Sequence, residues 1–122
     1  NNLLNIEILS LEGDRKINSI LKNRLRSHNN VNSNKLEIKI TNKYSKKDLS
    51  KDTSGNIETY QLTVKADFTV TTKDSEKIVS IIKNSKMQNF SDKFEERDYE
   101  DRLKENMANS IYENLLIQLT KK

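Results

Sequence analysis

Residues 60–71 carry the pattern that most limits the fold of this chain, because apolar and polar residues alternate there without a break. The apolar set is Tyr60, Leu62, Val64, Ala66, Phe68 and Val70, and the polar set is Gln61, Thr63, Lys65, Asp67, Thr69 and Thr71. A two-residue period places these sets on opposite sides of a β-strand. The pattern predicts a strand of roughly 35–40 Å with one buried face and one face open to water.

Three further segments are predicted to be strands of the same sheet. Residues 4–8 and 36–41 alternate in the same way, and residues 77–89 form a less regular strand that is mostly polar over 83–88. The polar stretch 43–56 is predicted to be a long loop that turns at residues 54–56, and residues 73–76 to be a hairpin turn. The last three strands are therefore expected to form an antiparallel meander.

Two segments have the period of an amphipathic helix instead. Residues 15–27 follow Gly13 and the candidate N-cap Asp14 and carry one apolar face. The second helix is expected to begin at Asp92, with Glu95 completing a capping box. Its apolar stripe comprises Tyr99, Leu103, Met107, Ile111, Leu115 and Leu119. Each helix has one apolar stripe, so both should cover the same face of the sheet.

The elements follow the order β-α-β-β-β-α. We therefore predict an α+β fold in which two helices pack on one face of a four-stranded mixed sheet. With 122 residues, the chain suits one domain spanning residues 1–122.

Composition and isolated residues argue against catalysis. The chain has no Cys, and Gly55 stands alone, so a thiolate site and a glycine-rich phosphate loop are both excluded. The single histidine, His28, lies in a polar turn and is predicted to be an exposed helix-end residue. We expect a protein that is not an enzyme and has no cofactor and no metal.

An acidic group near the start of the second helix raises the alternative of a metal site. Its members are Glu95, Glu96, Asp98, Glu100 and Asp101. Calcium loops need a turn with alternating oxygen ligands, whereas these acids lie on a helix among basic residues. A solvated helix start that matches the helix dipole is favoured, with Asp98–Arg102 and Glu100–Lys104 as surface pairs.

The formal net charge of +4 is mild and does not form the dense basic stripe of a nucleic-acid binder. RNA recognition on an open sheet would also need exposed aromatic residues, and Tyr60 and Phe68 share the predicted buried face. The simplest interpretation is that the basic residues are solvated surface lysines. The functional alternative is an anionic ligand, bound by the lysines of the long loop and of the fourth strand. These candidates are Lys43, Lys46, Lys47, Lys51, Lys83 and Lys86.

Four segments in this order resemble one family, the LptE-type lipopolysaccharide-assembly lipoproteins of Gram-negative outer membranes. Residues 17–25 (INSILKNRL) look like the first helix of the family. Residues 55–62 (GNIETYQL) look like its glycine turn and strand start. Residues 90–92 (FSD) and 96–115 resemble the segment before the last helix and that helix itself.

The resemblance implies a lipoprotein on the periplasmic side of the outer membrane. It would sit as a plug in an LptD-type β-barrel, bind lipopolysaccharide and assist its assembly at the cell surface. Its membrane contact would be an N-terminal lipid anchor on an acylated Cys, so we expect this Cys-free sequence to be a mature fragment. The alternative left open is a periplasmic auxiliary lipoprotein of a lipid transporter on a similar fold.

Overall fold

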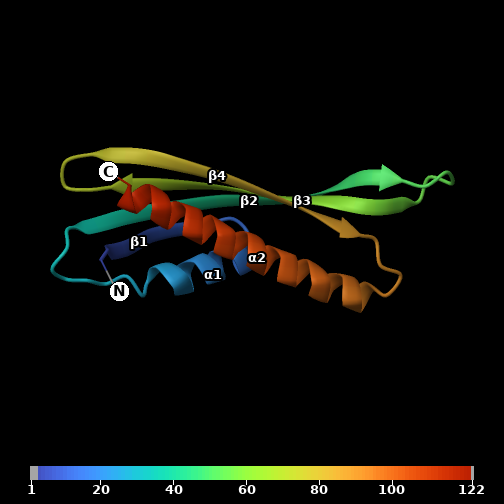
Figure 1. The fold of residues 1–122 in the computed structure, drawn as a ribbon, viewed down its shortest axis with the longest axis horizontal. Coiled ribbons are helices and arrows are strands. Elements are labelled where there is room, and N and C mark those ends of the chain that lie inside the picture. Colours follow the sequence, from blue (N-terminus) through green and yellow to red (C-terminus); the bar gives the residue numbers. More distant parts are fainter. Residues whose placement is uncertain (1–2, 122) are drawn as a thin grey trace.

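The computed structural model describes residues 3–121, which form a sheet covered on one face by two helices (Figure 1). The elements are β1 (Asn5–Glu12), α1 (Arg15–Leu25), β2 (Lys35–Lys51), β3 (Ile57–Thr71), β4 (Glu76–Gln88) and α2 (Lys93–Thr120). The sheet order is β1-β2-β3-β4, with β1 parallel to β2 and the other pairs antiparallel. The predicted α+β class, the element order and the meander of the last three strands are confirmed.

One core lies between the sheet and the helices. The apolar side of β3 is buried there, and Phe68, Leu62 and Val64 have no exposed surface. α1 contributes Ile17, Leu21 and Leu25, and α2 contributes Met107, Ala108, Ile111, Tyr112 and Leu115. Both predicted apolar stripes face this core except for Tyr99, which is 37% exposed, and no helix of residues 3–121 lies on the opposite side of the sheet (Figure 1).

The predicted long loop over residues 43–56 is wrong. β2 continues to Lys51 and pairs with β3 from Glu37↔Thr71 to Lys51↔Ile57. Only residues 52–56 form the turn, in which Asp52 Oδ1 accepts hydrogen bonds from the N–H groups of Ser54 and Asn56 (both 2.9 Å). The polar residues of β2 stay on a strand because the ladder with β3 satisfies their backbone groups.

The N-caps confirm the predicted helix starts, with one correction. Asp14 Oδ2 accepts from Ile17 N (3.1 Å), and Asp92 Oδ1 accepts from Phe94 N (2.9 Å) and Glu95 N (3.3 Å). The return arm of the second cap comes from Glu96 and not from Glu95. Glu96 Oε1 accepts from the N–H of Phe90 (2.8 Å), which fixes the chain as it enters α2.

Candidate functional site

The six candidate lysines lie on two strands of the sheet, and none lies in a loop. Lys43, Lys46, Lys47 and Lys51 belong to β2, whereas Lys83 and Lys86 belong to β4. Because side chains alternate along a strand, these residues divide between the helix-covered face and the opposite face, here called the open face.

The strand register identifies the lysines of the open face. Lys43 pairs with Lys65 of β3, and Gln61 of β3 lies between Lys47 on one side and Lys86 on the other. Lys65 and Gln61 belong to the polar set of β3, so their partners share the open face. We call Lys43, Lys47, Lys65 and Lys86 the lysine patch.

The patch is compact and is divided by a row of uncharged polar residues. It spans about 13 Å along the strands and about 10 Å across three strands, from standard strand dimensions. Ser45, Thr63 and Asn84 form the row between its two halves. The Asn84 Oδ1 atom accepts from Thr63 Oγ1 (2.7 Å) and from Gln61 Nε2 (3.3 Å), so this row is internally ordered.

The four ammonium groups of the patch have no carboxylate partner within residues 3–121. Lys43 and Lys65 lie directly opposite each other across the ladder, an arrangement of like charges that costs stability. Asp67 is the nearest acid of β3 on this face, and it accepts a hydrogen bond from Ser80 Oγ (2.6 Å). The patch is therefore a concentration of positive charge that an anion would relieve.

Lys46 lies on the opposite face and is held by α2. Its Nζ atom lies 3.0 Å from Glu100 Oε1 and 3.5 Å from Glu96 Oε2, and it stacks 4.4 Å from the ring centre of Tyr60. Burial of the ammonium opposes its charge, but the hydrogen bond and charge of Glu100 raise the pKa of Lys46. The side chain is thus engaged in joining β2 to α2.

The predicted solvated start of α2 needs a correction because two of its acids face the protein. Glu96 is 7% exposed, and Glu100 accepts from both Lys46 and Tyr44 Oη. Burial disfavours ionised Glu96, but the N–H of Phe90 and the ammonium of Lys93 lower its pKa. Burial, followed by the hydrogen bond to Glu100, raises the pKa of the Tyr44 phenol. No cluster suited to a metal ion occurs in the described part of the chain.

Lys104 likewise pairs across elements, and not with Glu100 as the surface-pair prediction had it. Its Nζ atom lies 3.0 Å from Asp14 Oδ1, so it ties α2 to the N-cap of α1. The Asp14 N–H donates to Asn42 Oδ1 (3.0 Å), and Asn42 Nδ2 donates to Asn18 Oδ1 (2.5 Å). This network fixes α1, α2 and β2 on the helix side, away from the lysine patch.

His28 is not the exposed helix-end residue that the sequence predicts. Its Nε2 atom lies 2.6 Å from Tyr112 Oη, and Nδ1 is buried without a hydrogen-bond partner among residues 3–121. The Arg24 guanidinium stacks 4.4 Å from the Tyr112 ring centre. Burial is the largest cause of a lowered pKa at His28, and the positive charge of Arg24 acts in the same direction. His28 therefore packs between the two helices, and its lowered pKa favours the neutral form of the ring.

Lys51 and Lys83 lie apart from the patch. Lys51 ends β2 beside the turn of the β2–β3 hairpin, which extends beyond both helices (Figure 1). Lys83 is half-buried on the helix side of β4 and lines a shallow depression with Asn106 and Ser110 of α2. The structure thus brings together three of the six candidates, Lys43, Lys47 and Lys86, and adds Lys65. The alternation of apolar and polar residues predicts that Lys65 lies on the solvent side of β3. Its position opposite Lys43 follows only from the strand register.

Comparison with known proteins identifies the family of this chain. A family model for LptE, described as lipopolysaccharide-assembly, matches residues 5–119. The chain belongs to the LptE family. It is thus a member of a family of lipopolysaccharide-assembly lipoproteins, as its sequence motifs indicate. A comparison with curated proteins gave no match.

Solved structures of several bacterial lipoproteins share this fold at low sequence identity. The rare lipoprotein B of Shewanella oneidensis is 16% identical, with a TM-score of 0.63 over 92% of this chain and 96% of that chain. Lipoprotein B of Nitrosomonas europaea is 14% identical, with a TM-score of 0.63 over 97% and 87% of the two chains. A minor lipoprotein of Acinetobacter baumannii is 13% identical, with a TM-score of 0.56 over 88% and 91%. At these identities the likeness describes the fold alone.

Within residues 3–121, neither helix combines the length and the apolar character needed to cross a bilayer.

Proposed function

We propose that this LptE-family chain is a non-enzymatic outer-membrane lipoprotein on the periplasmic side. In this proposal it binds an LptD-type β-barrel as a plug and assists lipopolysaccharide assembly, with the lysine patch as its lipopolysaccharide-binding surface. The observation that carries the ligand part is the patch itself, four lysines on the open face that have no carboxylate partner among residues 3–121. The barrel and the membrane side rest on family membership.

The chemistry of the open face suits a phosphorylated glycolipid. Lysine ammonium groups meet phosphates as compact point charges, and the patch offers several of them within about 13 Å. The row of Ser45, Thr63 and Asn84 between them provides hydroxyl and amide groups that can hydrogen-bond sugar hydroxyls. Lys46 and Lys83 face α2, and Lys51 lies apart at the end of β2, so these three lysines are not part of this surface.

Charge reversal within the patch tests the ligand. The Lys43→Glu/Lys65→Glu variant should weaken binding of purified lipopolysaccharide by about tenfold, because attraction becomes repulsion at two adjacent sites. The difference should shrink as salt is raised. The matched control is Lys16→Glu/Lys73→Glu, which changes two exposed lysines outside the patch and lowers the net charge of +4 by the same amount. Equal weakening by both variants would mean that net charge, and not the patch, governs binding.

Isolation of the lipidated protein from native envelopes tests the barrel. Mild detergent extraction and affinity capture should recover an LptD-type barrel in a stoichiometric complex. Recovery of an inner-membrane lipid transporter in its place would favour the auxiliary-lipoprotein alternative. The two experiments fail independently, since a barrel partner needs no lipopolysaccharide patch.

A further inference from the structure

The two edges of the sheet are protected to very different degrees. At the β1 edge, Ile6 N donates to His28 O (2.8 Å) and Asn30 N donates to Leu4 O (3.0 Å), so the segment after α1 covers the first residues. A register shift between Ile8 and Ser10 then interrupts β1. A covered start and a bulge are the devices by which proteins block edge-to-edge pairing.

The β4 edge has neither device. β4 pairs with β3 without a register shift from Glu76↔Thr71 to Gln88↔Thr59. Within residues 3–121 no hydrogen bond to its backbone from any element other than β3 is found. A long, regular edge of this kind presents a row of unpaired N–H and C=O groups that can pair with another chain.

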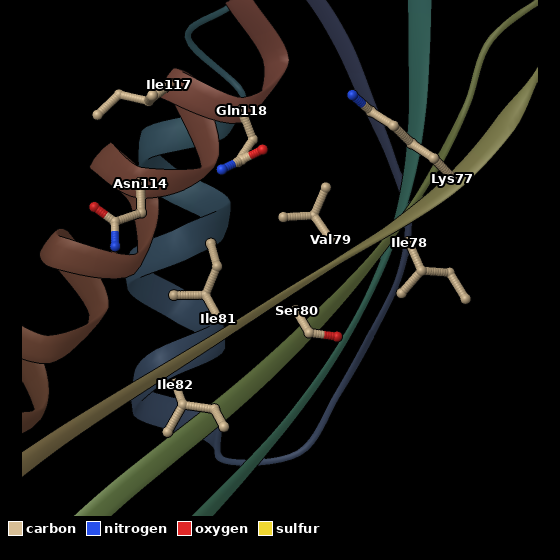
Figure 2. Close-up of a pocket in the computed structure, with 9 residues that line it drawn as sticks. All are labelled: Lys77, Ile78, Val79, Ser80, Ile81, Ile82, Asn114, Ile117 and Gln118. Carbon is tan, nitrogen blue, oxygen red and sulfur yellow. The ribbon is translucent and has the colours of Figure 1, made fainter. Parts of the chain in front are cut away.

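Apolar side chains gather along this edge on both faces. Ile78 is 67% exposed and Ile82 is 55% exposed on the open face. On the other face, Val79 and Ile81 point toward α2 and line a groove of about 600 Å³ with Asn114, Ile117 and Gln118 (Figure 2). Ile117 of α2 is 62% exposed beside it. A strand added at this edge would contact apolar side chains on both faces of the sheet.

The charge of β4 defines what kind of strand would fit. Its ionisable residues are one acid, Glu76, and the three lysines Lys77, Lys83 and Lys86. These lysines have no ion-pair partner among the described residues. Along the α2 side of β4 the sequence reads Lys77, Val79, Ile81, Lys83, so two aliphatic positions are flanked by two ammonium groups.

We propose that the free edge of β4 is a docking site for an extended segment of a partner protein, added to the sheet as a fifth strand. The complementary segment carries aliphatic residues at two alternate positions, flanked on the same face by carboxylates spaced as Lys77 and Lys83 are. Backbone hydrogen bonds hold the added strand, and the flanking charges set its register.

A second copy of this chain fits the edge less well. In the antiparallel pairing that sets Ser80 against Ser80, the aliphatic residues would match, but Lys77 of each copy would lie opposite Lys83 of the other. Like charges directly opposite each other are destabilising, and both copies carry a net charge of +4. Charge complementarity therefore favours an acidic partner. This proposal does not rest on lipopolysaccharide binding, because it concerns the edge and not the open face.

Synthetic peptides provide the test. The probe is the peptide Glu-Thr-Val-Thr-Val-Thr-Glu with Gly-Ser ends, and the control peptide has Lys at both Glu positions. Hydrogen exchange followed by NMR should show that only the acidic peptide protects the outward-facing β4 amides, with a Kd at least tenfold lower than that of the Lys peptide. The Lys77→Glu/Lys83→Glu variant should reverse this preference.

Edge-blocking variants complete the design. Ile78→Ser removes an exposed apolar side chain from the edge without changing the charge and should weaken binding of the acidic peptide by about tenfold. Val31→Ser is the control, because Val31 is 86% exposed in a turn away from β4. Lipopolysaccharide binding should be unchanged in Ile78→Ser, which separates this proposal from the lysine patch. The proposal is overturned if neither peptide binds, if both bind equally, or if the protein alone dimerises with protected β4 amides.

Discussion

Gly13 joins β1 to α1 at a point where a side chain cannot fit. Its φ angle is +116°, a region that residues with a Cβ atom rarely adopt. A Cβ atom placed there would lie 1.9 Å from the backbone oxygen of Asn42 and 2.8 Å from its carbonyl carbon. The neighbouring group is backbone of a central strand and cannot rotate away. Gly13→Ala therefore requires the β1–α1 turn to move relative to β2.

The cost of Gly13→Ala can be built from these contacts. Backbone strain contributes about 1–3 kcal/mol. Movement of the turn also separates Asp14 N from Asn42 Oδ1, now 3.0 Å apart, and leaving such groups unpaired costs about 1–3 kcal/mol. Replacing Gly by Ala restricts the unfolded chain and returns about 0.4–1 kcal/mol. We expect a net loss of about 3 kcal/mol in the free energy of unfolding.

Gly55→Ala is the matched control. Gly55 also has a positive φ of +87°, but nothing lies within 4 Å of its added Cβ. It should lose only about 1 kcal/mol from backbone strain. Urea unfolding followed by far-UV circular dichroism measures both variants. If the two losses agree within about 0.5 kcal/mol, the close approach of Gly13 to Asn42 does not contribute as argued.

Two further predictions concern His28 and the cap of α2. Because burial lowers the pKa of folded His28 below its usual 6.5, the unfolded chain binds more protons at mildly acidic pH. The free energy of unfolding should therefore fall as the pH drops from about 7 through about 6.5 toward the lower pKa of the folded state. The fall should be smaller in His28→Gln. Equal pH dependence of the two proteins in urea unfolding would contradict the argument. Asp92→Ala should cost about 1 kcal/mol in urea unfolding, because it removes the acceptor of the first α2 amides, whereas Asp98→Ala, in the helix interior, should cost less.

The sequence is sufficient for β3 and for the apolar stripes of both helices, because one face of each is buried and the other is open. It is not sufficient for the second half of β2. There the residues that face the helices are Asn42, Tyr44 and Lys46, and polar residues at core positions look like a loop. Their partners, Asn18 and Glu100, are remote in sequence, so local pattern cannot reveal that these groups are satisfied.

The candidate site shows the same limit. The alternation of apolar and polar residues in β3 predicts that Lys65 is exposed, and positive charge is what identifies Lys43 and Lys47 as candidates. That Lys65 lies opposite Lys43 depends on the register of β2 against β3, which the short turn at residues 52–56 helps to fix. A register shift after Asp48 takes Leu49 out of the ladder and obscures the alternation that would have extended β2. Sites assembled across strands therefore require the structure.

Photo-crosslinking tests most directly whether lipopolysaccharide binds the open face. Benzoylphenylalanine would replace Thr63, at the centre of the lysine patch, or Ser110, on α2 at the helix-covered side. After irradiation with purified lipopolysaccharide, the proposed function predicts a crosslinked product from the Thr63 position and none from the Ser110 position. Crosslinking from Ser110 alone, or equally from both positions, would contradict the assignment of the open face as the ligand surface.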